Sequence, residues 1–201
     1  AILSRGLGDV YKRQIQELKL GNPLKPETDL GPIINETSLN KLTSHKEKLI
    51  KSGKEFVELK NTIPNKGYFF NPIAFKVNSI NDIDGEKFGP ILHFIKYKAE
   101  ELESILEEVN GTGYGLTMGM HSRISGKARK VFENANIGNF YLNRDIVGAV
   151  VGVQPFGGQG LSGTGPKAGG PNYLHSFVNE KTFTDNVMAT GGNIDLLSKN
   201  N

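Results

Sequence analysis

The chain has 201 residues and a net charge of +3, and 37% of its residues are hydrophobic, which is enough for a folded core and argues against wholesale disorder. It contains no cysteine, which excludes disulfides, thiolate zinc sites and a cysteine nucleophile within these residues. Its lysines are scattered, so no nucleic-acid binding is predicted, and no apolar run approaches the ~20 residues of a transmembrane helix. The N-terminal run AILSRGLGDVYKRQ lacks a signal-peptide core, which favours a cytoplasmic location.

The first predicted elements are a loop and a surface helix. Three prolines and two glycines in residues 20–34 predict an extended loop. In residues 36–52, apolar side chains recur on one helical face, and lysines and glutamates occupy the other. Asn35 is suited to cap the start of this helix, and Gly53 is suited to end it.

An alternation of strands and helices follows. Residues 67–77 are apolar and aromatic with a proline at 72, which predicts a strand or strand pair near a sheet edge. The next expected elements are strands over 91–97, 115–122 and 138–143, with helices over 99–111 and 125–138 between them. This spacing favours a parallel sheet, in which ligands bind beyond the carboxyl ends of the strands.

Two further local features are predicted in the second half of the chain. Ser125 is the expected cap of the helix over 125–138, and Val131 and Phe132 belong to its expected buried stripe. The final segment is strand-like over 174–183 and becomes polar and irregular beyond it.

Residues 148–171 form a glycine-rich segment, with nine glycines and three prolines in 24 residues. The segment contains GxGxxG at 158–163, but TGPKAGGP follows where a dinucleotide fingerprint needs a helix. Pro166 likewise occupies the lysine position of a P-loop at 160–167. Two interpretations remain. One is a flexible loop, which composition alone favours, and the other is an anion site in which backbone N–H groups lie beside Phe156.

Other residues with potential chemistry give weaker signals. Glu86, in the turn GEKFGPILHF, could accept two hydrogen bonds from a diol such as the hydroxyls of a ribose, but a solvated turn glutamate is the more common arrangement. The histidines show no spacing typical of metal ligands; they are at positions 45, 93, 121 and 175. No Ser-His-Asp arrangement is recognisable, so no nucleophile is predicted.

Four stretches resemble the aldehyde dehydrogenase superfamily, in family order and with family spacing. They are LGNPLKPETDLGPII (20–34), GEKFGPIL (85–92), NGTGYGLTMGMHSR (110–123) and GNFYLNRDIVGAVVGVQPFGGQGLSGTGPKAGGP (138–171). The last is similar to the L-glutamate γ-semialdehyde (Δ1-pyrroline-5-carboxylate) dehydrogenases, and most of all to the C-terminal part of the bifunctional bacterial PutA enzymes. The resemblance covers about residues 15–195.

The resemblance implies roles for residues on both sides of an active site. On the substrate side, Gly148 and Ala149 would hold the carboxylate of glutamate γ-semialdehyde. Phe156 would pack on the aliphatic part of the substrate, and Asn143 would line the site.

On the cofactor side, Glu86 would bind the ribose of the nicotinamide and Phe88 would contact the nicotinamide. The implied fold is an α/β parallel-sheet catalytic domain, incomplete in this chain, with a C-terminal strand for homo-oligomerisation. The implied reaction is the NAD-dependent oxidation of L-glutamate γ-semialdehyde to L-glutamate in proline breakdown. Where a parent protein also has an upstream proline dehydrogenase domain, that domain would bind FAD.

The chain departs from the family in what it lacks. The family's nucleophilic cysteine, general-base glutamate and Rossmann domain lie upstream of the segment matched by 20–34, so no catalytic residue is predicted within this chain. Residues 1–14 do not match the family and are expected to be foreign or artefactual. We therefore expect 15–172 to be a partial catalytic domain, 173–201 to be an oligomerisation strand and tail, and the chain alone to be inactive.

Two alternatives to the dehydrogenase fragment stay open. One is a non-catalytic carboxylate-binding or interaction module derived from this family. The other is a phosphate- or nucleotide-binding domain that uses the glycine-rich segment.

Overall fold

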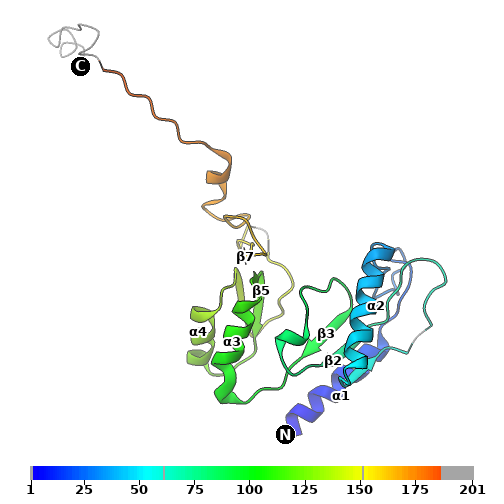
Figure 1. The fold of residues 1–201 in the computed structure, drawn as a ribbon. Helices are drawn as coiled ribbons and strands as arrows, with labels where there is room; N and C mark the ends of the chain where they lie inside the picture. The colour runs from blue at the N-terminus through cyan, green and yellow to red at the C-terminus, as the bar shows by residue number, and fades with distance from the viewer. Residues whose placement is uncertain (1, 61, 151, 187–201) are drawn as a thin grey trace, which may run out of the picture. The chain divides into compact units, whose positions relative to one another are not determined.

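The structure, a computed structural model, describes residues 2–60, 62–150 and 152–186. The chain forms two compact units, Ala1–Thr112 and Gly113–Asn201, whose elements are drawn in Figure 1. Among the described residues, no helix combines the length and the apolar character that a membrane crossing requires.

The first unit contains helices and a three-stranded sheet. Its elements are α1 (Ile2–Glu17), α2 (Glu36–Lys51), β1 (Phe56–Glu58), β2 (Ile73–Lys76), η1 (Ile80–Asp82), β3 (Ile91–Phe94), η2 (Ala99–Glu101) and α3 (Leu102–Gly111). β2 lies in the centre of the sheet, antiparallel to β1 and parallel to β3. The predicted helices over 36–52 and 99–111 and the strand within 91–97 are thereby confirmed.

The hydrophobic core of this unit lies between α2 and β2. Leu42 and Leu49 share one face of α2 and belong to the same buried cluster as Ile73 and Phe75 of β2. Each of these four side chains is at most 2% exposed. Burial of such a side chain contributes about 1.5–3 kcal/mol, so this cluster holds α2 against the sheet.

Both predicted ends of α2 are confirmed. At its start, the Asn35 side-chain oxygen accepts a hydrogen bond from the Ser38 N–H at 2.8 Å, which satisfies a donor that a helix leaves unpaired at its N-terminus. At its end, Gly53 takes the left-handed conformation with φ of 72° and donates its N–H to the Ile50 carbonyl. Glycine commonly ends helices in this way because it has no Cβ to strain that conformation.

The strand predicted within 67–77 is present, but its expected place near a sheet edge is wrong, because β2 has a neighbour on each side. Pro72 lies just before the strand, and its carbonyl accepts a hydrogen bond from the Leu59 N–H at 2.9 Å. A proline disrupts a central strand by withholding an N–H from a neighbour. Pro72 precedes the paired residues and therefore costs the sheet no such bond.

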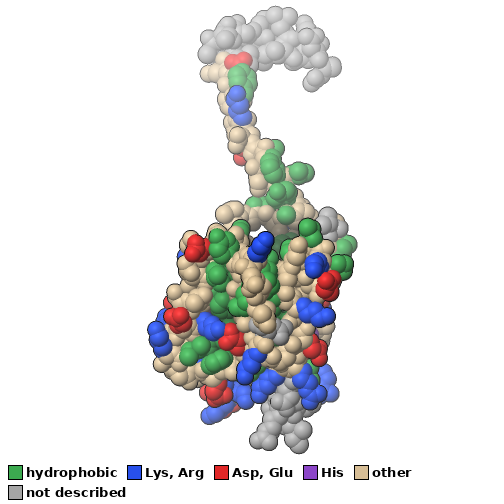
Figure 2. Space-filling model, turned by 90° about the vertical axis from the view of Figure 1, so that its right-hand side faces the viewer, with side chains coloured by type: hydrophobic (Ala, Val, Ile, Leu, Met, Phe, Trp, Pro, Cys, Tyr) green, Lys and Arg blue, Asp and Glu red, His purple; other side chains and the backbone are tan. Residues whose placement is uncertain are grey.

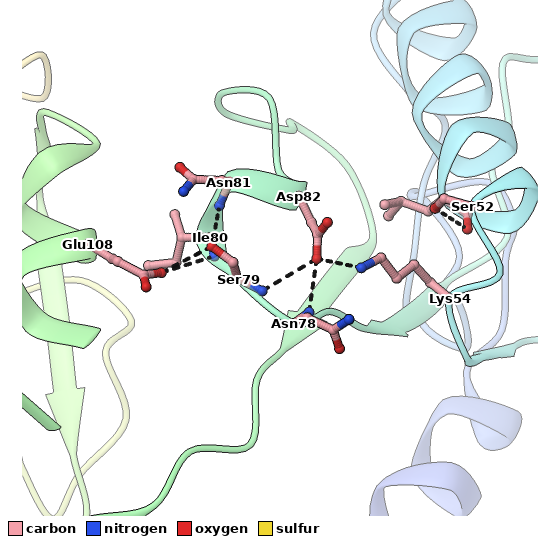
Figure 3. Close-up of polar contacts among 9 residues, drawn as sticks. Ser52, Lys54, Asn78, Ser79, Ile80, Asn81, Asp82 and Glu108 are labelled. Carbon is pink, nitrogen blue, oxygen red and sulfur yellow. Dashed lines mark hydrogen bonds and ion pairs between the residues drawn. The ribbon is translucent and has the colours of Figure 1, made fainter. Parts of the chain in front are cut away.

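Polar contacts join α3, η1 and the segment after α2 (Figure 3). Ser79 caps η1, and its Oγ donates to the Glu108 carboxylate of α3 at 3.2 Å. Asp82 accepts from the Lys54 Nζ at 2.6 Å and from the Asn78 N–H at 2.9 Å. The hydrogen bond from Lys54 lowers the pKa of the Asp82 carboxyl, so Asp82 stays ionised, and accepts both bonds, to a lower pH than an ordinary aspartate would.

The second unit contains a strand–helix–strand crossover and a small antiparallel pair. Its elements are β4 (Tyr114–Gly115), β5 (Thr117–Met120), α4 (Ser125–Asn134), β6 (Asn139–Leu142), β7 (Gln159–Gly160) and η3 (Tyr173–Phe177). β5 and β6 are parallel and joined by α4, as predicted, and β4 pairs with β7. The expected parallel pairing is present within each unit, between β2 and β3 in the first and between β5 and β6 in the second.

α4 is shorter than predicted at its C-terminal end, and two of its residues differ from expectation. Ser125 is the first residue of the helix rather than its cap; Ile124 holds the cap position without a side-chain hydrogen bond. Val131 is buried as expected, but Phe132 is 56% exposed. Successive residues turn by about 100° around a helix, so burial of Val131 directs its neighbour toward the edge of the buried face.

The strand predicted over 174–183 is not formed among the described residues. The first of them lie in η3, where the rings of Tyr173 and Phe177 meet edge to face. Residues 178–186 are in neither helix nor strand, because a strand needs hydrogen bonds to a neighbour and no described segment supplies them. Hydrophobic side chains stand uncovered along the tail in Figure 2, and Phe183 is 88% exposed. Residues 187–201 of the predicted tail lie outside the described residues.

Candidate functional site

β6 directs two buried polar side chains toward the glycine-rich segment. Asn139 is 9% exposed and Tyr141 is 6% exposed, and residues two apart on a strand face the same side. The Asn139 Nδ2 donates to the Pro155 carbonyl at 3.0 Å, and its Oδ1 accepts from the Gly157 N–H at 3.1 Å. One buried amide therefore fixes the backbone on both sides of Phe156.

Phe156 is held on its other edge by Ala168. Each of these two residues donates its N–H to the carbonyl of the other at 3.0 Å. Phe156 is half-buried, so part of its ring faces solvent. The backbone around this predicted substrate-contacting ring is therefore extended and bonded on both edges, which is more order than a flexible loop would have.

The backbone at Gly148 and Ala149 has the character expected of an anion site. Gly148 has a φ of 61°, and a Cβ built on it would meet no atom within 4 Å, so open space adjoins the backbone. Its carbonyl accepts a hydrogen bond from the Tyr141 hydroxyl at 2.9 Å. Within the described residues, the N–H groups of Gly148 and Ala149 donate to no acceptor, which leaves both available to a carboxylate.

Arg144 supports the Tyr141 ring. Its guanidinium lies 4.5 Å from the ring centroid, a distance that favours a cation–π interaction. Arg144 also donates to the Gln154 side chain at 3.4 Å and to the Asp145 carbonyl at 3.0 Å. The arginine thus links the residues before Gly148 to the residues before Phe156.

Asn143 lies at the end of β6 and is engaged by the protein itself. Its Oδ1 accepts from the Ser122 N–H at 2.9 Å, and its Nδ2 donates to the Ser122 carbonyl at 3.0 Å. Its φ of 57° is unusual for a residue other than glycine. This pair of bonds ties the residue after β6 to the segment after β5, and the predicted substrate contact of Asn143 stays a prediction.

Close packing explains part of the glycine content of this region. A Cβ on Gly138 would lie 1.8 Å from the Gly157 carbonyl oxygen, so the segment can approach β6 only where no side chain intervenes. The Lys167 ammonium donates to the Gly138 carbonyl at the same place. Residues 161–171 contain no helix, which confirms that the GxGxxG pattern is not a dinucleotide fingerprint.

The two residues predicted to bind cofactor lie in the first unit, beside α2. Glu86 and Phe88 line an open groove of about 840 Å³. Glu86 is exposed, Phe88 is 79% exposed, and the Glu86 carboxylate makes no hydrogen bond or ion pair with any described residue. An unpaired carboxylate beside an exposed aromatic ring fits the diol of a ribose and the flat face of a nicotinamide.

The charges next to Glu86 are paired with each other. Lys87 donates to the Asp84 carboxylate at 2.6 Å, and Lys48 of α2 donates to the other carboxylate oxygen at 3.0 Å. These two ammonium groups hold the pKa of the Asp84 carboxyl far below its usual range. Asp84 therefore stays ionised. It forms the ion pairs with Lys87 and Lys48, and Glu86 does not.

His45, which lines the same groove, pairs with His93 of β3, and this pair was not predicted. The Nε2 atoms of His45 on α2 and His93 on β3 are 2.8 Å apart, so one ring donates and the other accepts. Burial, with the charges of His45 and Lys87, lowers the pKa of His93 to about 4. Burial also lowers the pKa of His45, which is 4% exposed. The pair is a hydrogen-bonded contact between α2 and β3.

Comparison with known proteins gives consistent matches. Residues 7–183 match the model of the aldehyde dehydrogenase family. The chain is 40% identical over 173 residues to bifunctional protein PutA of Klebsiella aerogenes, and 36% identical over 186 residues to 1-pyrroline-5-carboxylate dehydrogenase of Bacillus subtilis. These alignments cover 83% and 88% of this chain, but 13% and 36% of the relatives. The chain thus spans about an eighth of the first relative and about a third of the second.

Solved structures agree with this assignment. A mutant of Bradyrhizobium japonicum proline utilization A (PutA) superposes with a TM-score of 0.77 and 42% identity, over 91% of this chain and 19% of that one. Betaine aldehyde dehydrogenase of Staphylococcus aureus, at 24% identity, shares the fold with a TM-score of 0.74 over 87% of this chain and 35% of that one. These likenesses confirm the expected incomplete α/β domain, and the chain belongs to the aldehyde dehydrogenase family.

Proposed function

We propose that this chain is the C-terminal part of a dehydrogenase module that oxidises L-glutamate γ-semialdehyde to L-glutamate with NAD. The observation that carries the proposal is the pair of N–H groups at Gly148 and Ala149, which donate to no acceptor among the described residues and lie next to open space. The names of the relatives, PutA and 1-pyrroline-5-carboxylate dehydrogenase, support a substrate of this kind.

The residues of this chain would serve binding and orientation. Two N–H groups aimed at one carboxylate stabilise its charge and fix the opposite end of the substrate. The half-buried ring of Phe156 would cover the aliphatic carbons between the carboxylate and the aldehyde. Positioning of this kind lowers a barrier because the reacting groups no longer have to find their orientation.

On the cofactor side, Glu86 would accept the ribose hydroxyls and Phe88 would adjoin the nicotinamide ring. NAD, when bound, supplies the acceptor for the hydride that leaves the substrate. The cysteine that attacks the aldehyde in this family has no counterpart here, since the chain contains none. We therefore place the nucleophile, the general base and the main cofactor-binding domain in a longer protein. In a bifunctional parent, a flavin-bound proline dehydrogenase domain would precede the module.

The test is NADH formation from glutamate γ-semialdehyde, measured for this chain and for the complete protein that contains it. The complete protein should form NADH, and the chain alone should form none. NADH formation by the purified chain would overturn the assignment of the nucleophile. A complete protein that reduces no NAD with this aldehyde would overturn the proposed reaction.

The absence of cysteine favours one other function, a binding module that keeps the carboxylate site without catalysis. Calorimetry separates the two proposals. Glutamate binding without turnover in the complete protein would favour the binding module.

Residues 1–14 stay a separate proposal. We infer that they are foreign to the family, although α1 runs from Ile2 to Glu17 as one helix and the family match begins at residue 7. Its last turn contacts β1, where the Gln16 side chain donates to the Glu58 carbonyl at 2.8 Å. The source DNA upstream of the Gln14 codon decides where foreign sequence begins.

A further inference from the structure

The glycine-rich segment is anchored to β6 at two points, one for each half of the candidate carboxylate site. Asn139 bonds the backbone around Phe156, and Tyr141 bonds the backbone at Gly148. Because the two side chains are two residues apart on one strand, their anchor points are separated by about 6–7 Å along β6. The strand, which is paired in parallel with β5, therefore sets the spacing between the two halves.

The hydrogen bond from the Tyr141 hydroxyl determines the direction of the Ala149 N–H. The carbonyl of Gly148 and the N–H of Ala149 belong to the same peptide unit, which is planar and trans. In a trans peptide these two groups point in opposite directions. When the Tyr141 hydroxyl holds the carbonyl at 2.9 Å, it turns the Ala149 N–H away from β6. A hydrogen bond to the carbonyl also polarises the amide, which strengthens its N–H as a donor.

The hydrogen bonds of Asn139 similarly fix the position of the Phe156 ring. The amide donates on the N-terminal side of Phe156 and accepts on its C-terminal side, while Ala168 bonds the Phe156 backbone itself. The backbone of Phe156 therefore cannot rotate without breaking several bonds. A buried amide that loses these partners leaves polar groups unsatisfied, so the arrangement is strongly preferred.

We propose that Asn139 and Tyr141 are positioning residues that make the site selective for an aldehyde with a distal carboxylate. Tyr141 aims the Ala149 N–H at the carboxylate, and Asn139 holds Phe156 beside the aliphatic carbons. The proposal rests on the proposed function of Gly148, Ala149 and Phe156. Neither positioning residue contacts the substrate.

The test compares two substrates in the complete enzyme that contains this chain. The ratio of kcat/KM for glutamate γ-semialdehyde to kcat/KM for butanal, a neutral aldehyde, measures selectivity for the carboxylate. Tyr141→Phe removes one hydroxyl and keeps the ring that Arg144 contacts. We expect it to lower the ratio about five- to tenfold through KM for the semialdehyde, the effect of one hydrogen bond, with butanal turnover unchanged. Asn139→Ala should lower the ratio at least as much.

Two controls remove similar groups away from the site. Asn134→Ala removes an amide that donates to the Lys130 carbonyl at the end of α4, and Tyr97→Phe removes the hydroxyl of an exposed tyrosine in the first unit. Both should keep the wild-type ratio. If Asn139→Ala does not fold, Tyr141→Phe decides the proposal alone.

The outcomes separate this proposal from the one on which it rests. A wild-type enzyme without preference for the carboxylate-bearing aldehyde overturns the proposed function and the selectivity role together. A wild-type preference that both variants keep overturns the positioning role and leaves the proposed function standing. An equal loss for both substrates reduces the two residues to structural ones and also contradicts the proposal.

Discussion

The angle φ at Gly148 determines whether the candidate carboxylate site can form. At φ of 61° a residue with a Cβ is strained by about 1–2 kcal/mol, so a side chain here would push the backbone toward a different conformation. The Ala149 N–H would then change direction, because it belongs to the peptide unit that follows this angle. The space around Gly148 is open, so the effect is one of backbone conformation and not of steric overlap.

Gly148→Ala should therefore raise KM for glutamate γ-semialdehyde in the complete enzyme by about tenfold, the effect of 1.4 kcal/mol, with a smaller change in kcat. The matched control is Gly126→Ala, on α4, where an added Cβ also meets nothing within 4 Å and φ is not positive. The control should leave both constants unchanged. Equal kinetics for Gly148→Ala and wild type would contradict the role of this backbone.

Glu86 gives a second prediction for a single side chain. If its carboxylate, which is unpaired among the described residues, holds a ribose diol, Glu86→Ala should raise KM for NAD by about tenfold or more, since hydrogen bonds to a charged group contribute about 1.5–3 kcal/mol. KM for the aldehyde should change little. Glu100→Ala, at an exposed position in η2, is the control. An unchanged KM for NAD would return Glu86 to the solvated turn glutamate that sequence alone favours.

At the scale of secondary-structure elements, a contact between α2 and β3 should make the stability of the first unit depend on pH. His45 on α2 and His93 on β3 share one hydrogen bond at 2.8 Å, which only neutral rings, or one neutral and one charged ring, can make. Protonation of both rings would place two positive charges together beside Lys87. The contact between helix and sheet is therefore favoured when the rings are neutral.

The pH dependence has a definite sign. Folding lowers the pKa of His93 from 6.5 to about 4, so between these values the unfolded chain binds more protons than the folded one. The free energy of unfolding should therefore fall as the pH falls through this range. Above pH 6.5 the stabilising contribution of the neutral His93 ring should be complete. Because the His93 ring is partly exposed and solvent screens its charge, we expect the free energy of unfolding to fall by about 1 kcal/mol between pH 6.5 and pH 4.

Urea unfolding of dilute chain at several pH values measures this effect. His93→Gln keeps a polar partner for His45 but does not titrate, so its stability should decline less between pH 6.5 and pH 4 than that of wild type. Carboxylates such as Asp84 and Asp82 remain in both proteins and contribute equally to the two curves. If the free energies of unfolding of wild type and His93→Gln fell equally with pH, His93 would not be the cause of the pH dependence.

Sequence patterns predict the elements that local forces determine. α2 was predictable because its apolar face, its Asn35 cap and its Gly53 stop all lie within a short stretch, and the β5–α4–β6 crossover followed from similar periodicity. The central place of β2 was not predictable, because Pro72 suggests an edge and only the pairing with β1 and β3 shows otherwise. The tail was mistaken for a strand because its apolar residues favour one, while strand formation depends on a neighbour.

The residues of the candidate site also differ in whether a local sequence pattern could predict them. Gly148, Phe156 and Glu86 were predicted because the family motifs contain them. Asn139 and Tyr141 were missed as site residues because their bonds reach residues 7 to 18 positions further along the chain, and no short motif encodes such bonds. His45 and His93 are 48 residues apart, so their pairing gives no local signal at all. Alternation of buried residues along β6 is the one signal that could have indicated Asn139.

At the scale of the whole molecule, the chain exposes apolar surface that a larger assembly would cover. Phe88, Leu161, Leu174 and Phe183 are each at least 70% exposed, and burial of an apolar side chain of this size contributes about 1.5–3 kcal/mol. We propose that other parts of a longer protein, and a partner subunit at the tail, cover these side chains in a homo-oligomer.

The isolated chain should therefore self-associate. Sedimentation at increasing concentration should show growth in mass, and replacing Phe183 and Leu174 by serine should reduce it. Replacing Lys181 and Thr182, the polar neighbours of Phe183, by serine is the control and should leave association unchanged. A monodisperse monomer with cooperative unfolding at all concentrations would contradict this expectation.

The measurement that most directly tests the central claim, that this chain is part of a thiol-dependent dehydrogenase, is the sequence of the source DNA upstream of the codon for Gln14. We predict an open reading frame that continues upstream into a cysteine-containing motif such as GQRCS. A genuine start codon just before Ala1, with no such motif upstream, would contradict it and would favour a natural cysteine-less binding module.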